Sequence, residues 1–249
     1  MMELKDKVVI VTGAGLGLGL AIAKKAYAEA AFTVLWDMNL ESVEKAANEL
    51  DPSGARVLAL KVNVTDEADV KAAVARTVDT FGRIDAIVNN AGISRHETLE
   101  NMTLELFEQV INVNLTGPFL CCKSVAPVMK KQKYGKIVNI ASLGARTGRP
   151  GVGVNYAASK AGLLGITKVL ARELGPDNIY VNAICPGPIL TDQTRQYAPD
   201  VFATWNAGRA VPKDGLPEDV ADAVIFLASS RSDWVTGITM DVNGGIFIG

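Results

Sequence analysis

The sequence predicts an α/β protein with a doubly wound parallel β-sheet and helices on both faces, a three-layer α/β/α arrangement. Short β-branched runs alternate with longer segments of helical periodicity from the first residues onward. The strand-like runs are almost continuously apolar, as expected when helices cover both faces of a parallel sheet. No repeat, low-complexity tract or linker interrupts the alternation, so residues 1–249 are expected to form one domain.

The first half of the chain supplies four of the expected strands. Apolar runs such as KVVIVTG and FTVLWD predict strands over 7–13, 32–37, 56–61 and 84–90. The segments between them have apolar residues at helical spacing and predict helices over 18–30, 40–50 and 66–80.

The second half continues the alternation. Runs such as KIVNIAS and IYVNAICPG predict strands over 136–142, 179–187 and 238–242, and helices are expected over 103–131, 155–174 and 217–229. Residues 188–216 contain several prolines and glycines and form the only long irregular stretch. Because such loops often act as active-site lids, this segment is the expected substrate loop.

The composition excludes several classes of protein. Hydrophobic residues make up 49% and charged residues 21% of the chain, which fits a large core and not a disordered protein. A net charge of −2 gives no basic footprint for nucleic acid, and no apolar run approaches the roughly 18 residues of a membrane span. The N-terminus lacks a signal-peptide pattern, so a cytoplasmic protein with a small-molecule partner is expected.

Cysteine and histidine are scarce. The three cysteines, two of them adjacent, predict reduced thiols and not a disulfide framework. A single histidine, His96, with no Cys/His cluster predicts that there is no metal site of the zinc type.

A glycine-rich turn, TGAGLGLG at residues 12–19, lies where the first strand passes into the first helix. Gly13, Gly17 and Gly19 allow tight turning and close approach of a ligand to backbone N–H groups, and a helix N-terminus favours a pyrophosphate. A purely structural turn is the alternative. The strand before it and the helix after it favour nucleotide binding, although the spacing is G-x-x-x-G-x-G.

Asp37 ends the second predicted strand, twenty residues after Gly17. A carboxylate there can accept hydrogen bonds from both ribose hydroxyls and would repel the 2′-phosphate of NADP. No Arg or Lys stands next to Asp37 or in the glycine turn, where Leu16 takes the place of a cation. NAD is therefore the expected cofactor, and an N-cap for the following helix is the alternative role of Asp37.

Five motifs in order resemble the short-chain dehydrogenase/reductase family in its short single-domain branch. They are TGxxxGxG, NNAG at 89–92, Ser142, Tyr156-x-x-x-Lys160 and PGPI at 186–189, and the resemblance extends from Lys5 to about Gly245. It implies a Rossmann fold and an oxidoreductase similar to 3-oxoacyl-carrier-protein reductases and to sugar or polyol dehydrogenases.

The resemblance also implies a catalytic tetrad. Tyr156 would exchange a proton with the substrate oxygen, and Lys160, one helical turn further, would stabilise its phenolate and hold the nicotinamide ribose. Ser142 would hydrogen-bond the substrate oxygen. Asn114, which the spacing favours over Asn112, would hold a water in a proton relay.

The remaining family positions are cofactor contacts. Asn63-Val64 departs from the more usual Asp-Val, although an Asn carbonyl can still accept from the adenine amino group. NNAG could also be only a strand-ending turn. The full expected set is Gly13, Gly17, Leu18, Gly19, Asp37, Asn63, Val64, Asn90, Gly92, Tyr156, Lys160, Pro186, Gly187, Ile189 and Thr191.

Substrate specificity is expected from residues 143–153, from the segment after NNAG and from 188–216. One reading is an anionic substrate such as a sugar acid held by an arginine fork, and the alternative is solvated loop arginines. His96 is either a donor at the pocket rim or an exposed loop residue. The arginines concerned are Arg146, Arg149, Arg195 and Arg209, with Tyr197 and Trp205 as candidate lid aromatics.

Three hypotheses follow. The first is an NAD-dependent dehydrogenase of a secondary alcohol, such as a polyol, sugar or sugar acid. The second is a 3-oxoacyl-thioester reductase, a class that usually works with NADPH. The third is a catalytically silent nucleotide-binding protein, against which the complete tetrad argues. The resemblance further implies a homotetramer, with helices 103–131 and 155–174 pairing between subunits and the C-terminal GGIFIG at another interface.

Overall fold

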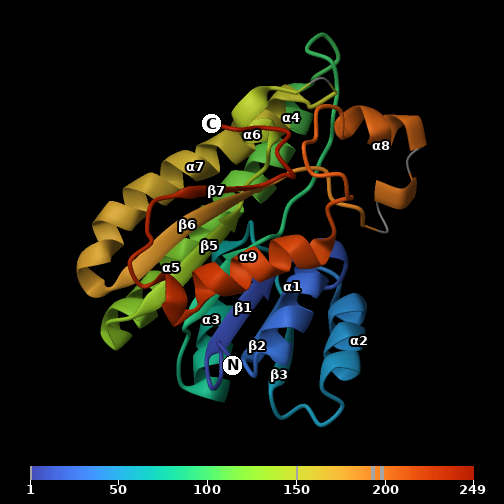
Figure 1. Cartoon of the computed structure of the whole chain (residues 1–249). Coiled ribbons are helices and arrows are strands. Elements are labelled where there is room, and N and C mark those ends of the chain that lie inside the picture. The colour runs from blue at the N-terminus through green and yellow to red at the C-terminus, as the bar shows by residue number, and fades with distance from the viewer. Residues whose placement is uncertain (1, 150, 192–193, 197–198) are drawn as a thin grey trace.

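The computed structural model describes residues 2–149, 151–191, 194–196 and 199–249. Its sheet has seven parallel strands in the order β3-β2-β1-β4-β5-β6-β7, so the chain winds outward from β1 first in one direction and then in the other (Figure 1). The predicted doubly wound parallel sheet is confirmed. The strands are β1 Val8–Thr12, β2 Phe32–Asp37, β3 Val57–Lys61, β4 Ala86–Asn89, β5 Gly135–Ile140, β6 Ile179–Pro186 and β7 Thr239–Val242.

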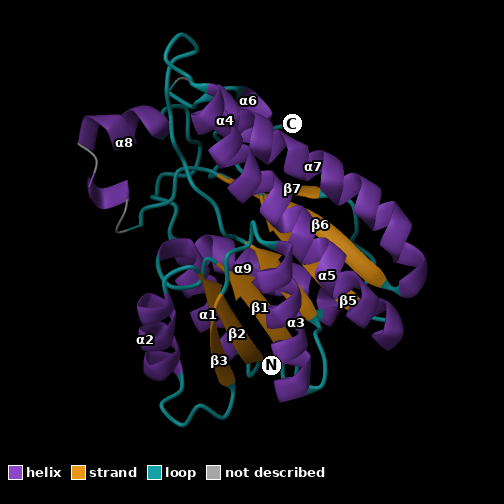
Figure 2. Cartoon of the chain, turned by 180° about the vertical axis from the view of Figure 1, so that it is seen from behind, coloured by secondary structure: helices purple, strands orange, loops and turns teal. Residues whose placement is uncertain are grey.

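Two apolar cores lie on the two faces of this sheet. On one face, α1 (Gly17–Ala28), α2 (Leu40–Leu50) and α9 (Pro217–Ala228) pack against Val9 and Val11 of β1. On the other, α3 (Glu67–Phe81), α5 (Gly117–Gln132) and α7 (Val154–Leu174) pack against Val8 and Ile10 (Figures 1 and 2). Successive residues of β1 thus enter opposite cores, which explains why the strand is continuously apolar from Val8 to Val11.

The helix expected over 103–131 is confirmed as a helical run over 104–132, but it contains a π-helical turn that the sequence did not predict. It is divided into α4 (Leu104–Ile111), a π-helical turn at Asn112–Thr116, and α5. Within the turn the N–H of Gly117 reaches back to the carbonyl of Asn112. A Cβ on Gly117 would lie 2.9 Å from a methyl group of Val64, so the wider turn is packed closely against the segment after β3. Such π-turns are frequent at functional sites.

The stretch 188–216, expected to be irregular, contains a 3₁₀ turn at Thr194–Gln196 and a short helix, α8 (Pro199–Trp205). Figures 1 and 2 show α8 beside the carboxyl edge of the sheet, away from its layers. The backbone N–H groups of Ala210 and Val211 both donate to the carbonyl of Gly244 at 2.9 Å. The end of this segment is therefore held by the chain that follows β7.

The other elements are short, and they complete the described fold. They are α6 (Gly144–Thr147) and 3₁₀ turns at Gly175–Asp177 and Ser230–Ser232. Within the described ranges, the helices are too short or too polar for any of them to cross a membrane.

Candidate active site

The residues of the candidate site gather at the carboxyl ends of β1, β4, β5 and β6. Strand order reverses between β1 and β4, the neighbours at the centre of the sheet. In open α/β sheets the crevice for a ligand lies at this switch point.

The glycine turn after β1 has a backbone that side chains would disrupt. Gly13 has φ +64°, in the left-handed region that favours glycine. A Cβ on Gly19 would stand 2.0 Å from the carbonyl oxygen of Gly13, and one on Gly13 would stand 2.9 Å from the Cα of Ala91. These glycines are therefore needed to pack the turn against the first turn of α1 and the end of β4.

The N-terminus of α1 has the features of an anion site. Leu16, its N-cap, supplies no side-chain hydrogen bond, and the first turn carries no acidic residue among the described positions. By contrast, α2, α3 and α4 are capped by the side chains of Asn39, Asp66 and Thr103. A Cβ at Gly17 would meet no heavy atom within 4 Å. The free N–H groups and the open space fit the pyrophosphate of a dinucleotide.

Asp37 lies at the carboxyl end of β2, directed toward the glycine turn. Its Oδ2 accepts a hydrogen bond from the N–H of Gly15 and its Oδ1 one from that of Asn39, both at 3.0 Å. The N-cap of α2 is Asn39, so the alternative role of Asp37 as that cap is wrong. The neighbouring Leu16 and Met38 are apolar and are 72% and 63% exposed, and Lys61 is the register partner of Asp37 on the adjacent strand β3.

The segment after β4 is clamped onto the glycine turn. The hydroxyl of Thr12 accepts hydrogen bonds from the N–H groups of Asn90 (3.0 Å) and Ala91 (2.9 Å). The amide of Asn90 donates to the carbonyls of Thr12 (2.9 Å) and Gly13 (3.2 Å). NNAG is therefore more than a strand-ending turn, because its hydrogen bonds hold the glycine turn after β1 in position.

Asn63, at the carboxyl edge after β3, uses its side chain within its own turn. Its Oδ1 accepts from the N–H of Thr65 at 3.1 Å and from the hydroxyl of Thr65 at 2.8 Å. The oxygen expected to accept from an adenine amino group thus already has two donors. A carbonyl oxygen has two lone pairs, so an adenine contact at this position would fall to other atoms.

Lys160 and Tyr156 share one face of α7, as their spacing predicts. The Nζ of Lys160 donates to the carbonyl oxygen of Ile140 at 2.8 Å, and the side chain is nearly inaccessible to solvent. Burial lowers the pKa of Lys160 to about 8. Burial also raises the pKa of Tyr156, and a hydrogen bond with Ser142 opposes that rise.

This balance differs from the expectation that the field of Lys160 lowers the pKa of Tyr156. The ammonium lies 5.9 Å from the centre of the phenol ring and is directed to the end of β5. Burial of the phenol is the largest cause of the raised pKa of Tyr156, and Lys160 is not among its causes. Ser142, whose hydroxyl also accepts from the N–H of Gly144 at 3.0 Å, is the direct polar neighbour of Tyr156.

Asn114, in the π-turn, binds the backbone of Ile93 on both sides. Its Oδ1 accepts from the N–H of Ile93 at 2.8 Å, and its Nδ2 donates to the carbonyl of Ile93 at 2.9 Å and to the hydroxyl of Ser159 at 3.2 Å. A Cβ on Gly92 would lie 3.2 Å from Asn114 Oδ1 and 3.4 Å from Lys160 Nζ. The structure therefore brings Asn114 and Lys160 together beside Gly92, around the position that a Cβ would occupy.

The PGPI segment forms the other wall of the crevice. A Cβ on Gly187 would stand 2.9 Å from the Cα of Asn243, so glycine permits the close approach of the chain after β7. Ile189 is buried. Thr191 is turned into its own loop, where its N–H donates to the hydroxyl of Thr194 at 2.7 Å and its hydroxyl accepts from the N–H of Thr194 at 3.2 Å.

Three of the four candidate arginines already have partners. Arg146 pairs with Asp241 at 3.4 Å and stacks on the ring of Phe247. Arg209 pairs with Asp214 at 2.7 Å, and Arg149 donates to the carbonyl of Trp205 in α8. Arg195 is exposed and lines a groove along α1 with Gly17 and Lys24. Tyr197 lies outside the described residues.

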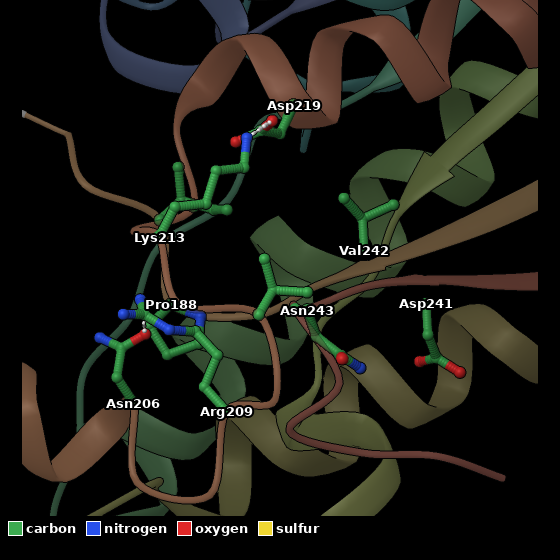
Figure 3. A pocket seen from close by; sticks show the side chains of 12 residues that line it. Pro188, Asn206, Arg209, Lys213, Asp219, Asp241, Val242 and Asn243 are labelled. Carbon is green, nitrogen blue, oxygen red and sulfur yellow. Dashed lines mark hydrogen bonds and ion pairs between the residues drawn. The ribbon is translucent and has the colours of Figure 1, made fainter.

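A cavity of about 250 Å³ lies behind the PGPI segment (Figure 3). Pro188 and Ile189 border it, but Ser142, Tyr156 and Lys160 do not. Some of its polar side chains pair with one another, as in the Lys213–Asp219 pair at 2.5 Å and the contact between Arg209 and Asn206 at 3.0 Å, whereas Oδ1 of Asp241 is buried without a hydrogen-bond partner among the described residues. The cavity is therefore a neighbour of the candidate site and not its substrate pocket.

Asn155 was not among the residues predicted from the sequence. It is fully buried, its Oδ1 accepts from the N–H of Tyr156 at 2.7 Å, and its Nδ2 donates to the carbonyl of Arg95 at 3.0 Å. An Asn at the first turn of a helix, directly before a functional Tyr, was the available signal, because Asn commonly binds backbone groups at helix starts. His96 lies at the rim, with its ring centre 5.4 Å from that of Tyr156.

Within the described part of the chain, His, Cys, Asp and Glu side chains form no group of three or more that could hold a metal ion. Cys185, in β6, is buried, and burial raises its pKa to about 11. The thiol therefore stays protonated at neutral pH.

Comparison with known proteins identifies the family. A family model described as "Enoyl-(Acyl carrier protein) reductase" matches residues 13–246. The chain is 40% identical to the 3-oxoacyl-(acyl-carrier-protein) reductase FabG of Thermotoga maritima, over 99% of this chain and 100% of that protein. It is 38% identical to the 3alpha-hydroxysteroid dehydrogenase of Mediterraneibacter gnavus, with 98% of each chain covered.

Solved structures give the same result for the fold. The crystal structure of gox2181 superimposes with a TM-score of 0.94 at 33% identity, covering 98% of this chain and 97% of that one. Together with the fold, the glycine turn and the Ser142, Tyr156 and Lys160 constellation, these matches show that the chain is an oxidoreductase of the short-chain dehydrogenase/reductase family.

Proposed function

We propose that this protein is an NAD(H)-dependent reductase of 3-oxoacyl thioesters, which converts the 3-oxo group to a secondary alcohol and also runs in reverse. The observation that carries the reaction type is the contact of Tyr156 with Ser142 beside buried Lys160. The relatives support the choice of a thioester substrate, and Asp37 supports the choice of NAD(H) as the cofactor.

The geometry around Asp37 supports NAD over NADP. A 2′-phosphate would add negative charge beside a carboxylate that already accepts two backbone hydrogen bonds. Neither Leu16 nor Met38, the exposed neighbours, can neutralise that charge. This preference departs from the NADPH that is usual for 3-oxoacyl reductases.

The roles of the catalytic residues follow from their positions. NAD(H), when bound, supplies or accepts the hydride. Tyr156, whose raised pKa keeps it protonated at neutral pH, donates a proton to the oxygen of the ketone during reduction. Ser142 hydrogen-bonds the same oxygen, and the ammonium of Lys160, 5.9 Å from the centre of the Tyr156 ring, stabilises the phenolate that this transfer leaves until the phenolate regains a proton from solvent. In the oxidation direction Tyr156 must first lose its proton.

The arginine contacts argue against a sugar acid. An arginine fork needs guanidinium groups that are free to bind a carboxylate. Arg146, Arg149 and Arg209 are held by Asp241, the carbonyl of Trp205 and Asp214. Several of the reported relatives are 3-oxoacyl reductases, and they favour the second of the three sequence hypotheses over a polyol or sugar substrate.

A second candidate is a ring alcohol, supported by the 38% identity to a hydroxysteroid dehydrogenase. Wild-type protein incubated with NADH or NADPH and a panel of acetoacetyl thioester, cyclic ketones and keto sugars, followed at 340 nm, separates the candidates. The proposal requires that the thioester with NADH gives the highest kcat/KM. It fails if NADPH or a cyclic ketone is preferred.

We also retain the homotetramer as a proposal. Phe119 on α5 and Val169 on α7 are 46% and 62% exposed, although both are large and apolar. These are the helices expected to pair between subunits, and exposed apolar faces often mark interfaces. Light scattering coupled to gel filtration should give about four times the chain mass of 26.4 kDa, and a monomer would reject this assembly.

A further inference from the structure

His96 lies in the connection between β4 and α4, and two contacts fix its ring. Its Nδ1 accepts a hydrogen bond from the N–H of Gly153 at 3.0 Å. The ring stands edge to face against Tyr156, with 5.4 Å between ring centres and 79° between planes. The imidazole is therefore held against the side chain that exchanges a proton with the substrate.

The backbone segments on both sides of this contact are packed closely together. A Cβ on Gly153 would lie 3.2 Å from the Cα of His96 and 3.3 Å from the carbonyl of Arg95, so glycine allows the two segments to meet. Asn155 binds the carbonyl of Arg95 and the N–H of Tyr156, which joins the same segments a second time. The buried side chain of Asn155 thus helps to set the position of His96 relative to Tyr156.

The hydrogen bond from Gly153 also decides which nitrogen carries the proton. Because Nδ1 accepts, a neutral imidazole must carry its hydrogen on Nε2. Partial burial lowers the pKa of His96, which favours this neutral form. In the part of the chain that the structure describes, no group accepts a hydrogen bond from Nε2, so this donor is free for a ligand.

We propose that His96 is a specificity-determining residue, whose Nε2–H binds a second oxygen of the substrate close to the reacting carbon. The inference rests on the proposed function, because Tyr156 must touch the reacting oxygen. A substrate oxygen one or two carbons further along then lies beside the imidazole that contacts Tyr156. In a 3-oxoacyl thioester that oxygen is the thioester carbonyl, which follows the 3-oxo carbon after one methylene.

The test compares two substrates that differ only in the second oxygen. They are S-acetoacetyl-N-acetylcysteamine and the matching thioether ketone, which lacks the thioester carbonyl. The quantity is the ratio of kcat/KM for the first over the second, with NADH, in wild type and variants. In His96→Phe, which keeps a ring against Tyr156 but has no donor, the ratio should fall about tenfold, the worth of one neutral hydrogen bond.

Two further variants separate specificity from structure. His96→Gln can donate from its amide nitrogen and should keep the ratio within about threefold of wild type. Glu97→Gln changes the exposed neighbour and should leave the ratio unchanged. If His96→Phe lowers kcat/KM for both substrates equally, or changes neither, the inference is wrong.

A failure of the proposed function has a different signature. If wild type reduces neither ketone, the thioester assignment fails. The two ketones are then replaced by butane-2,3-diol and butan-2-ol, whose oxidation is measured with NAD. The inference about His96 then stands if His96→Phe lowers the diol-to-alcohol ratio about tenfold and falls if it does not.

Discussion

The ammonium of Lys160 lies 5.9 Å from the centre of the Tyr156 ring and donates its 2.8 Å hydrogen bond to the carbonyl of Ile140. The cation is thus anchored to the end of β5 and not to the phenol. Burial lowers the pKa of Lys160 and raises that of Tyr156. Each side chain is therefore closer to neutral than it would be in water.

The buried lysine should make the stability of the protein depend on pH. Its pKa is about 8 in the fold, against 10.5 for an ordinary lysine. Above pH 10.5 both states are neutral. As the pH falls toward 8 the unfolded chain binds a proton that the folded chain resists, so stability is lost, by about 3 kcal/mol in total.

Urea titrations of wild type and Lys160→Met at pH 7 and pH 10.5 measure this effect. The free energy of unfolding of wild type, relative to the variant, should rise by about 3 kcal/mol between these two pH values. Lys168→Met, on the exposed side of the same helix, is the control. A difference between wild type and Lys160→Met that does not vary with pH would contradict the buried position of the ammonium.

Gly19→Ala should disrupt the glycine turn after β1. The added Cβ would stand 2.0 Å from the carbonyl oxygen of Gly13, which is backbone and cannot rotate away. We expect a loss of about 2 kcal/mol of stability and at least tenfold weaker NADH binding. Gly165→Ala on α7 meets nothing within 4 Å and should stabilise the helix by up to about 1 kcal/mol. Equal behaviour of the two variants in thermal melts and NADH fluorescence titrations would reject this account of the turn.

Asp37→Ala should weaken the discrimination against NADP. Removing the carboxylate takes away the repulsion of a 2′-phosphate and the ribose acceptor together. The ratio of kcat/KM for NADH over NADPH should fall at least about tenfold, the factor that corresponds to 1.4 kcal/mol. Glu41→Ala, in the first turn of α2, is the matched acidic control and should keep the wild-type ratio. An unchanged ratio in Asp37→Ala would remove Asp37 from cofactor selection.

The sheet could be predicted from the sequence because each strand is a short apolar run bounded by polar residues. In β1, Val8 and Val9 face opposite cores, so a continuous apolar run indicates a strand that is buried on both faces. The helix over 103–131 was predictable, but the π-helical turn within it was not. This turn accompanies the packing of Gly117 against Val64 and the binding of Ile93 by Asn114, contacts between segments that only the fold brings together.

The site was predictable where the chemistry is local to a motif. Tyr156 and Lys160 lie one helical turn apart, and helical geometry alone places them on one face. The ion pairs of the arginines were not predictable, because the partner of Arg146 is Asp241, which lies far along the chain in β7. The contact of His96 with Gly153 likewise joins two loops that the sequence leaves unrelated.

The role of Tyr156 is tested most directly by the rate of ketone reduction in Tyr156→Phe. NADH oxidation with acetoacetyl thioester is followed at 340 nm, NADH binding is measured separately by fluorescence, and Tyr27→Phe serves as the matched control. Because Phe keeps the ring but cannot donate a proton, kcat should fall at least about 100-fold while NADH still binds. Wild-type turnover in Tyr156→Phe would contradict the proposed catalytic centre.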